Sequence, residues 1–77
     1  MLNRISIDPK ICHGKPCIKG TRIMISVILA LLEEGLNFDQ IKEEFPELAN
    51  EDIQQAIEYA RITIENEEIH LLTSINS

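Results

Sequence analysis

Three side chains that can bind a metal or take part in redox chemistry lie in one short stretch: Cys12, His13 and Cys17. Zinc favours thiolate and imidazole ligands, but a closed structural site needs four, and the remaining candidate, His70, lies far along the chain. A Cys12–Cys17 disulfide is sterically feasible but is opposed by a reducing cytoplasm, whereas nearby lysines favour a reactive thiolate. We expect no bound metal and no cofactor, with Cys17 packed as a small hydrophobic side chain.

The sequence shows no arrangement of residues typical of an active site. It has no glycine-rich loop followed by a helix and a lysine, and no serine, histidine and aspartate at useful spacing. Most of its carboxylates fall where helices are expected to face solvent. We therefore predict that the protein has no catalytic residues and is not an enzyme.

The two parts of the chain carry opposite charge. Residues 1–22 hold five basic side chains and one carboxylate, a net charge of +4, whereas residues 23–77 hold two basic side chains and twelve carboxylates, a net charge of −10. Opposite charges suggest two different partners, although both charges would also keep the protein soluble. Because phosphates attract cations, we expect any DNA to contact the first part, through Lys10, Lys15, Lys19 and Arg22.

A second set of candidates for DNA contact lies on the last predicted helix: Gln54, Gln55 and Arg61. Glutamine amides can recognise adenine edges, but exposed helix glutamines of no special role explain the pattern as well. The carboxylates of this helix outnumber its one arginine and would repel phosphates. The basic part of the chain is therefore the better electrostatic candidate.

Hydrophobic periodicity predicts a small sheet followed by a helix. Alternation in RISID predicts a short strand, residues 17–18 a second and residues 22–25 a third, with turns at Gly14 and Gly20. The period then changes to that of a helix over residues 26–35, with Ser26 as its N-cap and Gly35 at its C-terminal end.

Two further predicted helices are joined by a short connector, which is the outline of a helix-turn-helix. Asn37 and Gln40 are spaced as a capping box for the second helix, and Pro46 marks its end. Asn50 is the expected cap of the third helix, which runs to about residue 68. We predict a mainly α, single-domain fold: a β-arm (residues 1–25), a three-helix homeodomain-like core (residues 26–69) and a tail (residues 70–77).

The first predicted helix is apolar around its whole circumference from residue 27 to residue 32, so every side of it must be covered. So small a core covers one face or two, and we expect a homodimer, with full burial inside a monomer as the alternative. The predicted interface residues are Ile5, Ile7, Ile18, Val27, Ile28 and Leu31. This apolar stretch is too short to cross a bilayer and no signal peptide opens the chain, so we expect a cytoplasmic protein.

Two consecutive segments, ISIDPKICHGKPCIKGTRI and VILALLEEGLNFDQIKEEFPELANEDIQQAIEYA, resemble the family called domain of unknown function 433. The resemblance covers residues 5 to about 69, and GKPCIKGTR is its most specific part. It implies a homeodomain-like helical domain with an N-terminal β-arm, often dimeric. It also implies an antitoxin of a type II toxin–antitoxin pair, which binds a PIN-like ribonuclease toxin and its own operator DNA.

We therefore expect an antitoxin-like regulator that binds such a toxin and operator DNA. A stand-alone DNA-binding transcriptional regulator is one alternative, and a small metal or redox sensor that uses Cys12, His13 and Cys17 is another. Within the GKPCIKGTR segment, Thr21 and Arg22 can link the arm to a helix end by hydrogen bonds. For Arg22, a bidentate pair with a carboxylate competes with contact to phosphate.

Overall fold

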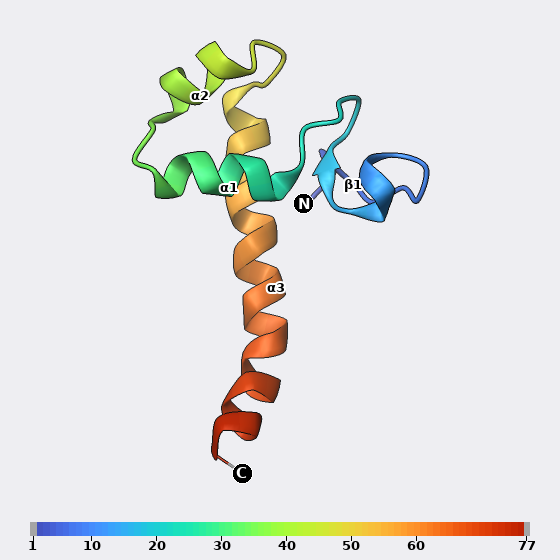
Figure 1. Cartoon of the computed structure of the whole chain (residues 1–77), viewed down its shortest axis with the longest axis vertical. Helices are drawn as coiled ribbons and strands as arrows, with labels where there is room; N and C mark the ends of the chain where they lie inside the picture. Colours follow the sequence, from blue (N-terminus) through green and yellow to red (C-terminus); the bar gives the residue numbers. More distant parts are fainter. Residues whose placement is uncertain (1, 77) are drawn as a thin grey trace.

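The computed structural model describes the backbone of residues 2–76 and the side chains of residues 2–66. The elements follow in the order β1 (Ile5–Ser6), the 3-10 helix η1 (Cys12–Gly14), β2 (Cys17–Ile18), α1 (Ile25–Glu33), α2 (Phe38–Glu44) and α3 (Asn50–Asn76). The predicted fold class is confirmed, because three helices follow a small two-stranded antiparallel sheet, and α1 crosses α3 (Figure 1). None of the described helices is long and apolar enough to cross a membrane.

Local signals define the start of α2 and the end of α1 as expected. The Asn37 side chain accepts a hydrogen bond from the Gln40 backbone N–H at 2.8 Å, and the Gln40 side chain accepts one from the Asn37 N–H at 2.9 Å. These two bonds complete the predicted capping box. Gly35 follows α1 with a φ of +99°, a conformation that residues with a Cβ rarely adopt. α2 ends at Glu44, just before Pro46.

The predicted cap of α1 is wrong. Met24 holds the N-cap position with no side-chain hydrogen bond, and Ser26 lies exposed inside the helix. The residue just before β2 supplies an acceptor instead, because the backbone N–H of Ile25 donates to the carbonyl of Pro16 at 3.0 Å. A long-range backbone contact therefore replaces the local serine cap.

The start and the end of α3 also differ from the prediction. Asn50 is the first helical residue rather than the cap, and the Asp52 carboxylate accepts a hydrogen bond from the preceding Ala49 N–H at 2.8 Å. No glycine or proline follows Pro46, and the helix continues to Asn76, beyond the expected end near residue 68. The side chains of the predicted tail lie outside the described residues.

The sheet is smaller than predicted. Ile5 pairs with Ile18 and Ser6 with Cys17, but residues 22–25 form no third strand. An isolated bridge between Cys17 and Met24 stands in its place. The chain enters α1 at residue 25, so this segment is too short to form a regular ladder.

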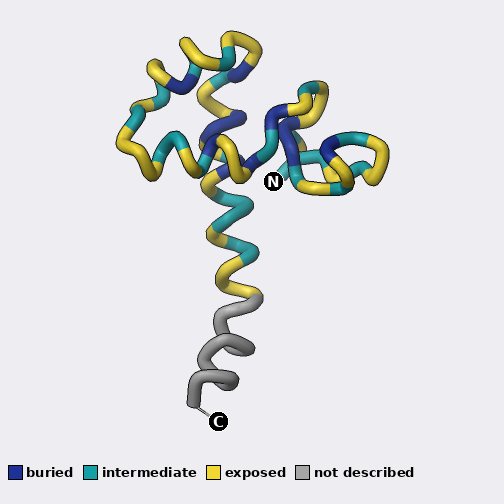
Figure 2. Tube along the Cα trace, viewed as in Figure 1, coloured by how far each residue is buried: buried dark blue, intermediate teal, exposed yellow. Residues whose placement is uncertain are grey.

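The core joins the sheet to all three helices. Figure 2 shows buried positions in each of the three helices and beside the sheet. Four isoleucines are each at most 2% exposed: Ile18 of β2, Ile28 of α1, Ile41 of α2 and Ile53 of α3. They pack with four further buried residues: Ile23, Ile25, Leu48 and Ala56. Burial of aliphatic side chains is the main favourable term in folding, so this cluster holds the small domain together.

The core corrects part of the predicted dimer interface. Ile18 and Ile28 lie inside the core of the single chain, so neither can contact a second copy. Their own chain covers them because β2 and α1 both face the same isoleucine cluster. α1 is nevertheless not fully covered by its own chain, because Val27 is 39% exposed. The alternative prediction, full burial of α1 within the monomer, is therefore not observed.

Candidate partner-binding site

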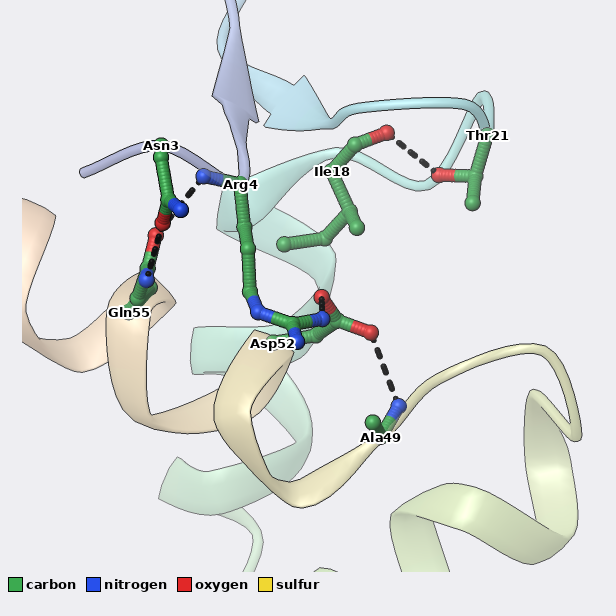
Figure 3. Close-up of polar contacts among 7 residues, drawn as sticks. All are labelled: Asn3, Arg4, Ile18, Thr21, Ala49, Asp52 and Gln55. Carbon is green, nitrogen blue, oxygen red and sulfur yellow. Dashed lines mark hydrogen bonds and ion pairs between the residues drawn. The ribbon is translucent and has the colours of Figure 1, made fainter.

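A network of polar side chains ties the N-terminal segment to α3 (Figure 3). Arg4 Nη1 donates to Asp52 Oδ1 at 2.9 Å, and the Arg4 backbone N–H donates to Gln55 Oε1 at 2.9 Å. Gln55 Nε2 in turn donates to Asn3 Oδ1 at 2.8 Å. Asp52 is only 6% exposed, so its carboxylate is shielded from water and depends on these donors. The network holds the segment that leads into β1 against α3.

This network corrects the predicted role of Gln55. Both polar atoms of its side-chain amide bond to the N-terminal segment, so the side chain is not free to recognise a base. Arg61 forms an exposed pair with Glu65 at 2.9 Å, and Gln54 is exposed. Of the three residues predicted to contact DNA on α3, Gln55 stabilises the fold, Arg61 is paired with a carboxylate, and Gln54 is exposed.

The stretch from residue 10 to residue 22, part of the predicted β-arm and called the basic segment below, exposes its cations to solvent. All four predicted DNA contacts are exposed, and within residues 2–66 none of them forms an ion pair. These four are Lys10, Lys15, Lys19 and Arg22. The arginine of the N-terminal region that does pair with a carboxylate is Arg4, so the carboxylate partner proposed for Arg22 is not observed.

Thr21 organises the turn that carries Lys19 and Arg22. Its hydroxyl donates to the Ile18 carbonyl at 2.8 Å and accepts from the Ile23 N–H at 3.0 Å. Both partners belong to the same turn, so Thr21 does not link the arm to a helix end as predicted. Gly20 completes the turn with a φ of +83°. The cations are therefore held on a defined backbone.

The two cysteines point at the same turn. Cys12 Sγ lies 3.3 Å from the Arg22 carbonyl oxygen, and Cys17 Sγ lies 3.7 Å from the Thr21 carbonyl oxygen. Burial raises the pKa of the Cys17 thiol, and the neighbouring Cys12 thiol raises it further. Cys17 is 1% exposed, which agrees with its predicted role as a small packed side chain.

The predicted weak metal candidates do not come together as a ligand set. His13 is exposed and has a φ of +57°, in the left-handed region. Among the side chains of residues 2–66, no group of three histidines, cysteines or carboxylates is placed to hold an ion. The side chain of His70 lies outside the described residues.

An apolar groove of about 340 Å³ lies where α1 crosses α3, next to the end of η1. Lys15 lies at its rim, and Ile64 of α3 is 59% exposed beside it. Its lining is otherwise Pro16, Ile25, Ser26, Leu29, Tyr59, Ala60 and Thr63. We call this surface the groove. No pattern in the sequence predicts the groove, because its walls come from three segments that only the tertiary fold brings together.

Two comparisons with known proteins relate the whole chain to a family. A sequence model of the family Protein of unknown function (DUF433) matches residues 5–60. The crystal structure of a DUF433 member protein from Anabaena variabilis ATCC 29413 is similar, with a TM-score of 0.71 and 27% sequence identity. That similarity covers 97% of this chain and 70% of the other. A third comparison, with curated proteins, finds no match.

Proposed function

We propose that this chain, which belongs to the DUF433 family, is an antitoxin-like regulator. We also propose that it acts in the cytoplasm and is not an enzyme. It binds a PIN-like ribonuclease toxin through its helices and operator DNA through its basic segment. The observation that carries the proposal is the apolar groove between α1 and α3, which the described part of the chain leaves open to solvent. An open apolar surface on so small a domain is characteristic of a binding site for another protein.

The groove supports binding of apolar side chains from a helix of the toxin. Its exposed surface is mostly apolar, although Lys15, Ser26 and Thr63 contribute to the lining, so an apolar side chain that enters it leaves water without burying unpaired polar groups. Burial of one Leu, Ile or Phe side chain contributes about 1.5–3 kcal/mol. Two or three such side chains therefore supply a large share of a nanomolar affinity.

Charge supports the same orientation. Of the carboxylates in the described part of α3, Asp52 is buried against Arg4 and Glu65 pairs with Arg61, whereas Glu51 and Glu58 form no ion pair within residues 2–66. A ribonuclease must present a basic surface to RNA, and an acidic helix beside an apolar groove complements such a surface. Binding in this orientation would cover the surface with which the toxin contacts RNA.

Co-expression with the product of the adjacent gene tests the proposal. With a tag on either protein, we expect the two to purify together and this chain to rescue growth from the toxicity of its neighbour. Recovery of no partner, together with no rescue, would contradict the proposal.

A pair of variants on α3 tests the groove itself. Ile64→Asp places a charge at the edge of the groove, and we expect at least a tenfold weaker complex because an aliphatic contact is lost. Ile57→Asp is the matched control, because Ile57 is 41% exposed on the same helix and does not line the groove. An equal loss for both variants would place the contact elsewhere on α3.

A homodimer is a separate proposal, supported by the other side of α1. Val27 is 39% exposed and Leu31, four residues later, lies on the same face of the helix, while Ile7 is 58% exposed. We expect light scattering to give a dimer mass at micromolar concentration and Val27→Asp to give a monomer. Ser26→Asp, on the groove side of α1, is expected to leave the dimer intact. A monomer mass for the unaltered chain would overturn this proposal.

A further inference from the structure

Two buried thiols face one turn of the basic segment. Cys12 Sγ and Cys17 Sγ lie 3.3 Å and 3.7 Å from the carbonyl oxygens of Arg22 and Thr21, which are consecutive residues. The thiols therefore lie at the two ends of the 12–17 loop, and each faces the carbonyl of one of two consecutive residues. The two thiols are also neighbours, since after burial a hydrogen bond with Cys12 and the charge of Cys12 are the next causes that raise the pKa of Cys17.

We propose that Cys12 and Cys17 form a redox-active dithiol, which small-molecule disulfides oxidise to an intramolecular disulfide. Both sulfurs are free thiols in the structure. Disulfides in proteins of a reducing compartment are usually transient and serve redox sensing, and this pair consists of two neighbouring thiols on one short loop. The proposal does not depend on the antitoxin-like function, because it concerns a reaction of this chain with a small molecule.

The difference in exposure assigns the order of the two steps. Cys12 is 9% exposed and Cys17 is 1% exposed, so Cys12 is the sulfur that a small disulfide reaches first. The Cys12 thiolate attacks one sulfur of that disulfide, forms a mixed disulfide and releases the first small thiolate. Cys17 then loses its proton, attacks Cys12 Sγ and releases the second. In total two protein thiols are oxidised, one small disulfide is reduced, and two small thiols form.

Closure of the disulfide changes the turn that carries the cations. The carbonyls of Thr21 and Arg22 lose the thiol donors that now face them. Cys12 and His13 both have left-handed backbone conformations, with φ values of +54° and +57°, which non-glycine residues rarely adopt. The 12–17 loop is therefore under local strain. A new covalent bond at Cys12 couples the redox state of the two cysteines to the placement of Lys15 and Lys19.

Incubation of the reduced native protein with glutathione disulfide tests the proposal. We expect the intact mass to fall by two hydrogen atoms and to return on addition of dithiothreitol. Trypsin does not cleave between Lys15 and Pro16, so both cysteines remain in the single peptide 11–19. We expect the mass loss in that peptide. An unchanged mass, a stable mixed disulfide or a disulfide between two chains would each overturn the proposal.

Two cysteine variants test the order of the steps. Cys17→Ser is expected to stop at the mixed disulfide on Cys12, with the added mass of one glutathione. Cys12→Ser is expected to remain unmodified when native and to react in urea, because the fold buries Cys17. Rapid modification of native Cys12→Ser would contradict the assigned order. If either variant fails to fold, the peptide mass of the unaltered protein still decides whether the dithiol closes.

Discussion

Asp52 is the buried carboxylate that ties the N-terminal segment to the start of α3. Its two carboxylate oxygens accept from different donors, Oδ1 from Arg4 Nη1 and Oδ2 from the Ala49 N–H. One oxygen thus holds β1 against α3, and the other stabilises the first turn of α3. The Arg4 side chain is 41% exposed, so solvent weakens the ion pair itself, and the buried hydrogen bonds of Asp52 matter more.

Asp52→Asn tests this dual role. The asparagine amide offers an oxygen to one donor and turns its NH₂ group toward the other, so one buried donor loses its acceptor. We expect the free energy of unfolding to fall by about 1–3 kcal/mol, measured by urea unfolding. Asp39→Asn is the matched control, because the Asp39 side chain is 90% exposed and lies 3.6 Å from Lys42; its change should stay within about 0.5 kcal/mol. Similar losses for both variants would show that Asp52 has no special role.

At the scale of elements, α2 is the helix that depends most on a local signal. It is short, from Phe38 to Glu44, and contributes one fully buried side chain, Ile41, to the core. A helix of this length is not stable alone in water. The capping box satisfies two backbone N–H donors at its start, those of Asn37 and Gln40, and the burial of Ile41 in the core supplies the remaining stability.

Asn37→Ala is expected to lower the free energy of unfolding by about 1 kcal/mol, because the N–H of Gln40 loses its side-chain acceptor. Asn37→Asp keeps an acceptor at the same place and should change the stability by less than about 0.5 kcal/mol. Both values are measured by urea unfolding. Equal stability of the alanine and aspartate variants would mean that the cap contributes nothing to α2.

At the scale of the whole molecule, unlike charges are segregated. The cations of the basic segment are exposed and form no ion pair within residues 2–66, whereas α3 is acidic over its described length. The tie between Arg4 and Asp52 fixes the basic segment to the helical body, so the two charged surfaces have set positions. This arrangement supports one acidic and one basic partner for the same small domain.

Salt dependence of DNA binding tests the basic surface. We expect a duplex from the region upstream of this gene to bind with an affinity that falls steeply with salt. The double variant Lys15→Ala/Lys19→Ala should bind more weakly and reduce the salt slope by about 2, one for each phosphate contact. Lys42→Ala is the control, since Lys42 lies on α2 beside Asp39, and it should leave the slope unchanged. Binding that is absent or independent of salt would remove DNA from the proposal.

Local chemistry made much of the fold predictable from the sequence. The capping box at Asn37, the helix end at Gly35 and the short strand Cys17–Ile18 were all predicted and are all observed. Each of these features depends on residues within a few positions of one another, so a single segment carries the whole signal.

Only the tertiary structure decided which side chains stay exposed to solvent and which form contacts within the chain. Arg4 meets Asp52, and Gln55 meets Asn3, across about fifty residues of chain, and the sequence offers no spacing that predicts such pairs. The same folding hides Ile18 and Ile28 in the core and opens a groove between α1 and α3. A pattern of apolar residues shows only that a side chain must leave water. Which neighbouring residue covers that side chain depends on how distant segments pack. Only the complete set of contacts in the fold determines this packing.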